Sequence, residues 1–169
     1  ILNRFKSFSS RSKENMNLIS MNDIIFSIYE LMEHQLIKQN ITCKIEADEN
    51  LPAVYGDKQG LQQVVSNLMI NAIHALEGRN REERRIVIKT SFSEENVYMA
   101  IEDNGCGVPK SLQERIFDPY FTTKSAEKGT GLGMAIIKSI LHNHRALINL
   151  DSEEGKGTVF TVSFPFVNR

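Results

Sequence analysis

The 169-residue sequence has no tryptophan, only four prolines and only two cysteines, Cys43 and Cys106. The cysteines lie far apart and form no CxxC pair, so the sequence predicts neither a zinc site nor a disulfide framework. No apolar run approaches the roughly 18 residues of a membrane-spanning helix, and the first residues lack the apolar core of a signal peptide. We therefore expect this part of the protein to be cytoplasmic, whether or not the full-length protein is anchored to a membrane.

An excess of either charge is also missing. Lysine and arginine total 20 residues, aspartate and glutamate total 21, and the net charge is -1. A nucleic-acid-binding domain normally carries a basic surface, so we expect no nucleic-acid partner. Hydrophobic residues make up 41% and charged residues 24% of the chain, which are ordinary values for a globular domain.

The first residues differ in pattern from the rest. Residues 1–15 place Ile1, Leu2, Phe5 and Phe8 on one helical face and then become polar, as at the end of a helix from a preceding domain. The chain also begins without a methionine, in the middle of this pattern. We therefore interpret it as part of a longer protein, with a helix tail and linker at 1–15 and one folded domain at 16–169.

Hydrophobic periodicity predicts the elements of that domain. The expected helices have apolar residues at helical spacing and cover 23–39 (capped by Asn22), 58–76 and 131–143. The expected strands alternate in polarity and lie at 41–47, in a hairpin of 84–93 with 96–103, and in a final hairpin within 145–166, with a possible short strand at 18–20. Residues 50–57 are predicted to be a turn-rich connector. This order favours an α+β fold, a two-layer α/β sandwich with a mixed, mostly antiparallel five-stranded sheet and three main helices on one face.

The second predicted helix carries an unusual polar stripe. Gln63, Asn67, Asn71 and His74 are separated by four, four and three residues, so they lie on one face. The stripe is either the solvent side or a functional face. A solvent side usually carries lysine and glutamate, whereas this stripe carries amides. The carbonyl oxygen of asparagine is a suitable ligand for Mg²⁺.

Two glycine clusters follow. In "DNGCG", Asp103 ends a strand, and Gly105 and Gly107 allow unusual backbone angles or the close approach of a ligand. A carboxylate there can accept a hydrogen bond from the exocyclic amine of adenine, whereas guanine presents a carbonyl at that place. The alternative is an ordinary Asp-Asn-Gly turn.

The second cluster, "GTGLG" at 129–133, leads into the third predicted helix. The free N–H groups of a helix start bind anions, and glycine lets a phosphate come close, although a flexible hinge has the same composition. The intervening "TTKSAEK" has the composition of a lid. Within it, Lys124 is either a phosphate-neutralising group or a generic surface lysine.

Together these motifs resemble the ATP-binding (Bergerat) fold of the GHKL superfamily, which includes DNA gyrase-type ATPases, Hsp90, MutL and histidine kinases. The resemblance covers about residues 17–167, with "NLMINAIHA" as the N box, "DNGCG" as the G1 box, "FDPYF" as the F box and "GTGLG" as the G2 box. It is strongest to sensor histidine kinases of the nitrogen-regulatory and sporulation type. Residues 1–15 are then similar to the end of a dimerisation helix.

The resemblance implies a role for each motif. Asn71 would coordinate Mg²⁺ bridging the ATP phosphates, with Asn67 beside it. Asp103 would bind the adenine amine, helped through water by Thr158, and His74 would stand where relatives place a basic residue near the phosphates. The remaining implied contacts are Gly105 and Gly107 on the adenine side, Gly129, Thr130, Gly131, Leu132 and Gly133 along the phosphates, and Lys124 near the γ-phosphate.

Asn67 separates two branches of the superfamily. In the ATPase branch this position is similar to a glutamate that activates water, and an amide cannot act as a general base. We therefore expect transfer of the γ-phosphoryl group to a histidine, as in two-component sensor kinases. The alternatives are a GHKL-type ATPase or molecular clamp, and a degenerate domain that serves as a nucleotide-binding signalling module.

The resemblance also implies partners. Histidine kinases carry the acceptor histidine on a preceding helical hairpin, followed by an acidic residue, and none of the histidines here fits: His34, His74, His142 and His144. We therefore expect the acceptor on a separate dimerisation domain and, after it, a response regulator. The full-length protein is expected to be a homodimer and this chain a monomer.

Overall fold

The computed structural model describes residues 16–122 and 131–165, so the tail predicted for residues 1–15 lies outside the described residues. The helices are α2 (Met21–Lys38), α3 (Lys58–Ala75), the short α4 (Lys110–Gln113) and α5 (Gly133–Asn143). The strands are β1 (Met16–Ile19), β2 (Thr42–Glu46), β3 (Val54–Asp57), β4 (Arg85–Phe92), β5 (Asn96–Asp103), β6 (Leu147–Glu153) and β7 (Gly157–Pro165).

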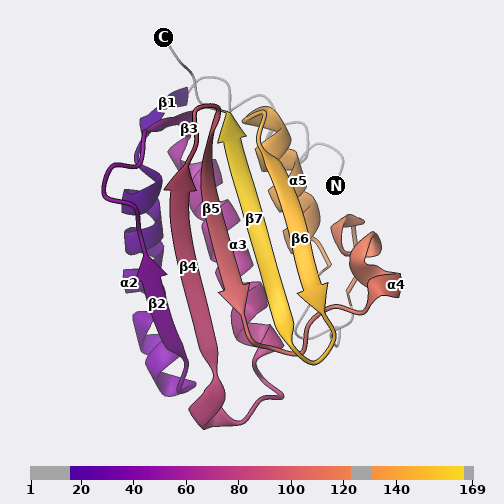
Figure 1. Ribbon diagram of the computed structural model, residues 1–169. Coiled ribbons are helices and arrows are strands. Elements are labelled where there is room, and N and C mark those ends of the chain that lie inside the picture. Colours follow the sequence, from indigo (N-terminus) through magenta and orange to yellow (C-terminus); the bar gives the residue numbers. More distant parts are fainter. Residues whose placement is uncertain (1–15, 123–130, 166–169) are drawn as a thin grey trace.

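Five of the strands form the main sheet, in the order β2-β4-β5-β7-β6. β2 runs parallel to β4, and every other neighbouring pair is antiparallel. The three long helices α2, α3 and α5 lie behind one face of this sheet (Figure 1). The structure thus confirms the predicted two-layer α/β sandwich with a mixed, mostly antiparallel sheet.

The core lies between these two layers. Alternate residues of β5 and β7 are buried on the helix side, among them Val97, Met99, Val162 and Phe164. α3 is the central helix, and its buried residues recur at helical spacing: Leu61, Val64, Val65, Leu68, Met69, Ala72 and Ile73. Burial of such side chains is the main favourable contribution to folding, and it fixes which face of α3 is left for the polar stripe.

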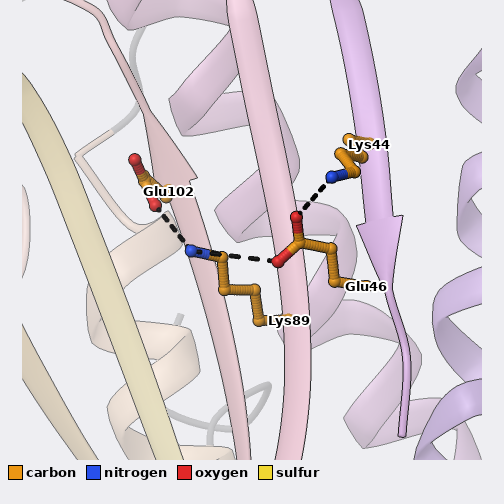
Figure 2. A network of polar contacts seen from close by, with 4 residues as sticks. All are labelled: Lys44, Glu46, Lys89 and Glu102. Carbon is orange, nitrogen blue, oxygen red and sulfur yellow. Dashed lines mark hydrogen bonds and ion pairs between the residues drawn. The ribbon is translucent and has the colours of Figure 1, made fainter.

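The opposite face of the sheet is charged. Lys44 Nζ lies 2.8 Å from Glu46 Oε1, and Lys89 bridges the sheet from Glu46 (4.0 Å) to Glu102 (3.4 Å), as Figure 2 shows. These side chains alternate along their strands with the inward apolar residues, so they point away from the helices. Exposed ion pairs of this kind contribute little stability, but they keep this face polar.

The predicted cap of the first helix was wrong. Ser20, not Asn22, is the N-cap, and its hydroxyl accepts from Asp23 N at 3.2 Å. Asn22 lies within the first turn and makes long-range contacts instead. Its Nδ2 donates to Asp48 O at 2.8 Å, and its Oδ1 accepts from the Thr90 hydroxyl at 3.0 Å. Both residue types suit an N-cap, so local sequence does not distinguish them.

Other elements also differ from the prediction. The connector expected at 50–57 contains β3, which pairs with β1 in a separate two-stranded antiparallel sheet. The short strand expected at 18–20 is β1 at Met16–Ile19. The third helix starts at Gly133 rather than Gly131, because Gly131 has φ 65°, outside the helical region.

A buried histidine joins the end of α5 to the start of α3. His144 is 5% exposed; its Nε2 accepts from Asp57 N at 2.9 Å, and its Nδ1 lies 2.7 Å from Ile140 O. A carbonyl only accepts, so Nδ1 carries the proton and the ring is the neutral Nδ1–H tautomer. The Asp57 carboxylate in turn caps α3, accepting from Gly60 N at 3.0 Å. A Cβ at Gly56 would lie 2.8 Å from the imidazole, so only glycine fits there.

We predict that His144→Ala lowers the free energy of unfolding by about 2–4 kcal/mol, because it removes two buried hydrogen bonds and leaves a cavity. His142→Ala is the matched control, since His142 is exposed on the same helix and should change stability by less than about 0.5 kcal/mol. Urea unfolding followed by circular dichroism measures both. Equal effects of the two substitutions would contradict this role for His144.

Candidate functional site

A cavity of about 390 Å³ lies between α3, the start of α5 and the loop that follows β5. It collects most of the described residues that the sequence motifs single out: Asn67, Asn71, His74, Asp103, Gly107, Gly131, Gly133 and Thr158. Gly105, Leu132 and Gln63 do not line it. Lys124, Gly129 and Thr130 lie outside the described residues.

Much of the remaining lining is apolar and was not predicted from the sequence: Ile70, Ala75, Val108, Pro109, Leu112, Ile116, Phe121, Met134 and Phe160. Ile70 lies between Asn67 and Asn71 in the same helix, so the helical spacing contained a signal for it. The others come from the end of α3, from α4 and α5, and from loops and strands that only the fold brings together. An apolar wall with a few polar groups is typical of a small-molecule site.

The polar stripe of α3 faces this cavity. Asn67, Asn71 and His74 are half-buried. Asn67 Nδ2 approaches Gly133 O at 3.5 Å, and Asn71 Nδ2 donates to Met134 Sδ at 3.1 Å. The amides therefore contact the first turn of α5 across the cavity, and their face of α3 is not a plain solvent side.

Asp103 lies at the other end of the cavity. It is 6% exposed, it pairs across the sheet with Thr158 of β7, and its Oδ1 accepts from Gly105 N at 2.8 Å. The pKa of this carboxyl is raised from its ordinary 3.8 to about 6, mainly by burial; the N–H groups of Gly105 and Thr158 oppose the rise, and the nearby charge of Glu102 adds to it. A buried carboxyl that titrates near neutral pH, inside a cavity, is typical of a functional group.

The glycines after Asp103 are required by close packing. A Cβ at Gly105 would lie 2.6 Å from Ala75 O, at the end of α3. Gly107 has φ 68°, and a Cβ there would lie 2.1 Å from Glu153 O. Cys106, between them, donates its N–H to Ala75 O at 3.0 Å. The loop after β5 is thus held against the end of α3 and the β6–β7 turn, which fixes the position of the Asp103 carboxyl.

The second glycine cluster lies at the start of α5. Gly131 O accepts from Tyr120 N at 2.8 Å, so the two ends of the segment between Tyr120 and Gly131 meet. Leu132 is the half-buried N-cap of α5. Gly133 differs from the other glycines of the site, because a Cβ built there would meet no atom of the described residues within 4 Å. The described part of the chain therefore leaves open space beside the first turn of the helix.

The described residues contain no group of three or more His, Cys, Asp or Glu side chains that could hold a metal ion by themselves. Asp103 is the only carboxylate among the residues that line the cavity in the described part of the chain. Across the same described ranges, no helix has the length and apolar character needed to cross a membrane.

Known proteins share this sequence pattern. The family described as "Histidine kinase-, DNA gyrase B-, and HSP90-like ATPase" matches residues 56–168. The signal transduction histidine-protein kinase AtoS of Escherichia coli is 33% identical over 98% of this chain and 26% of its own length. Sporulation kinase A of Bacillus subtilis is 33% identical over 90% of this chain and 24% of its own length. The chain thus spans about a quarter of these relatives.

Solved structures share the fold. The catalytic domain of histidine kinase ThkA, in a nucleotide-free form, matches with a TM-score of 0.78 and 33% identity over 89% of this chain and 95% of that chain. ThkA in complex with the response regulator protein TrrA matches with a TM-score of 0.71 and 29% identity, over 89% of this chain and 41% of that chain. The chain therefore belongs to the histidine kinase-, DNA gyrase B- and HSP90-like ATPase family and, within it, to the catalytic domains of sensor histidine kinases.

Proposed function

We propose that this chain binds ATP with Mg²⁺ and delivers the γ-phosphoryl group to a histidine on a separate dimerisation domain. One observation carries this proposal: the amides of α3 face the first turn of α5 across a cavity that ends at the buried carboxyl of Asp103. The Asp103 carboxyl suits the base of a nucleotide, and the amides of α3 with the first turn of α5 suit its phosphates. The cavity of about 390 Å³ falls within the size range of small-molecule sites.

The Asp103 end of the cavity suits adenine. An ionised carboxylate accepts a hydrogen bond from an exocyclic amine and repels a carbonyl, which favours adenine over guanine. Thr158 lines the cavity beside Asp103 and supports the same contact, directly or through water. Gly107 and the apolar side chains of Val108 and Phe160 also line the cavity and suit the faces and edges of a flat ring.

The α5 end suits phosphate. The first N–H groups of a helix have no partner within the helix and favour an anion. Because the described residues leave space beside Gly133, phosphate oxygens have room among them to approach the first turn. Gly131 and Leu132 precede this turn. We assign the same role to the residues outside the described ranges: Gly129, Thr130 and, at the γ-phosphate, Lys124.

Asn71 would hold Mg²⁺ through its amide oxygen. Mg²⁺ usually takes few protein ligands and completes its shell with phosphate oxygens and water, so a single amide without a carboxylate cage fits this ion. His74 lies one turn further along α3 and would approach the phosphates. When bound, Mg²⁺ neutralises the charge of the phosphates during phosphoryl transfer.

The chemistry of α3 favours transfer over hydrolysis. Asn67 cannot take a proton from water, and phosphoryl transfer needs mainly positioning and charge neutralisation from the nucleotide side. A neutral imidazole is already a nucleophile near pH 7, so the acceptor needs no base from this domain. An ATPase or molecular clamp is therefore the less favoured alternative.

The histidines of this chain are poor candidates for the acceptor. His144 is buried with both ring nitrogens hydrogen-bonded, whereas His34 and His142 are exposed on α2 and α5 of this domain. We therefore propose a separate, dimeric phosphoacceptor domain in the remainder of the protein, with transfer in the cytoplasm to a response regulator. The structure of the similar kinase ThkA with a response regulator supports the last step.

The first test supplies this chain with the dimerisation hairpin of its full-length protein and ATP labelled at the γ-phosphate. We expect acid-labile, base-stable phosphohistidine on the hairpin, reduced about tenfold or more by Asn71→Ala, because the Mg²⁺ ligand is lost. Gln63→Ala is the matched control, since Gln63 belongs to the same stripe but does not line the cavity. Rapid ATP hydrolysis without phosphohistidine would favour the ATPase, and absence of nucleotide binding would favour a degenerate module.

The second test addresses recognition of adenine by Asp103. Asp103→Asn should weaken ADP binding about tenfold to a hundredfold, because a hydrogen bond to a charged group is lost, and should leave inorganic tripolyphosphate binding unchanged. Glu102→Gln is the control, since Glu102 lies next in sequence but points to the other face of the sheet toward Lys89. Calorimetry measures all three proteins. An equal loss of tripolyphosphate binding would count against adenine recognition by Asp103.

The third test uses pH. Below about pH 6 the folded protein keeps a proton on Asp103, so we expect ADP affinity to fall as the pH drops through about 6. The Asp103→Asn variant should lack the part of this fall that comes from Asp103. Any pH dependence that it keeps comes from other groups, including the nucleotide itself, and serves as the control. Calorimetry from about pH 5 to pH 8 gives the comparison; parallel profiles of the two proteins would refute the prediction.

The same shift has a consequence for stability. The folded pKa of Asp103 exceeds its ordinary value, so the folded state binds this proton more tightly than the unfolded state. The contribution of Asp103 to the free energy of unfolding is therefore largest below about pH 4 and declines as the pH rises to about 6. Urea unfolding of the nucleotide-free chain should show this decline, relative to Asp103→Asn.

A further inference from the structure

Ser152 of β6 lies behind the base end of the cavity and contacts three polar groups there. Val108 N donates to the Ser152 hydroxyl at 2.8 Å, the hydroxyl donates to Gly157 O at 2.8 Å, and it lies 3.0 Å from Thr158 Oγ1. The sequence motifs give Ser152 no role, and it does not line the cavity itself.

These contacts determine which group is the donor in each of the three hydrogen bonds of the Ser152 hydroxyl. A serine hydroxyl has one proton and two acceptor positions. A backbone N–H only donates and a carbonyl only accepts, so Val108 N occupies one acceptor position and Gly157 O takes the proton. The contact with Thr158 must then use the second acceptor position of Ser152, and the proton in that contact comes from the Thr158 hydroxyl.

Thr158 is therefore left as an acceptor toward the cavity. It is 4% exposed and lines the cavity, and its proton is directed to Ser152. Asp103, its cross-strand partner, is also an acceptor when ionised. Two neighbouring buried acceptors favour a ligand edge, or a bridging water, that brings donor protons, and they leave an incoming carbonyl oxygen without a partner.

We propose that Ser152 is a positioning residue that makes Thr158 an acceptor and thereby adds to the preference of this site for an amino over an oxo purine. The proposal rests on the proposed function, since it concerns the same nucleotide. The amine of adenine donates, whereas the oxo group of hypoxanthine or guanine accepts. Ser152 thus acts on the ligand through Thr158, without touching it.

Gln113 of α4 holds Ser152 in place. Its Nε2 donates to Val108 O and to Ser152 O, both at 2.9 Å. Gln113 thereby connects the loop after β5, at Val108, to the edge strand β6, at Ser152. This second connection keeps the N–H of Val108 and the hydroxyl of Ser152 within hydrogen-bonding distance, on which the proton arrangement depends.

The test compares ADP with IDP, which carries hypoxanthine, by calorimetry on the chain with Mg²⁺. Ser152→Ala releases the Thr158 proton, which becomes able to rotate toward an oxo group. We expect the ratio of ADP to IDP affinity to fall about fivefold to tenfold from its value in the unmodified chain. Ser152→Thr keeps a hydroxyl and should retain the ratio. Ser163→Ala, which removes a serine from the outward face of β7, should leave it unchanged.

A second pair of variants tests the acceptor role if Ser152→Ala does not fold. Thr158→Val removes the acceptor and should weaken ADP but not IDP, whereas Thr158→Ser should keep the preference. Equal loss of both nucleotides in Ser152→Ala, or in Thr158→Val, would overturn this inference, while ADP binding by the unmodified chain would still support the proposed function. If the unmodified chain binds neither nucleotide, the proposed function itself fails together with this inference.

Discussion

The nucleotide cavity depends on the packing of α5 against α3, and one neutral imidazole fixes that packing at its far end. His144 connects the last turn of α5 to the residue that caps α3, through Asp57 N and Ile140 O. At the other end, Asn67 and Asn71 contact the first turn of α5. Neither helix can shift along the other without breaking one of these sets, so the fold sets the spacing of the groups assigned to phosphate and Mg²⁺.

The base end is built differently, from strands and loops. Asp103 comes from the end of β5, Thr158 from the start of β7 and Ser152 from the end of β6, which are neighbouring strands in the sheet. Burial opposes the charge of Asp103, and two backbone N–H groups partly offset that cost. The site therefore combines a rigid helix pair at one end with a desolvated polar cluster at the other.

Sequence reasoning was most successful where the signal is local. The spacing of Asn67 and Asn71 and the order of the glycine motifs predicted most of the polar residues that line the cavity, because helix periodicity and chain order determine them. It failed for the Ser20 cap and for β3, where partners distant in sequence decide. Ser152 was missed for the same reason: its partner Val108 lies 44 residues away, and only the finished sheet brings them together.

The register of β5 also determines which of two neighbouring carboxylates faces the cavity. Glu102 points outward to Lys89 (Figure 2), and Asp103 points into the cavity. A slip by one residue would exchange these carboxylates between the two faces. Gly157 opposes such a slip, because a Cβ at its position would lie 2.0 Å from Asp103 O. A slip would bring a residue with a side chain to this position, where only glycine fits. Under the proposed role of Asp103, the alignment of two strands thus sets which nucleotide the site accepts, and outer residues such as Ser152 offer evolution a way to change that preference without moving the alignment.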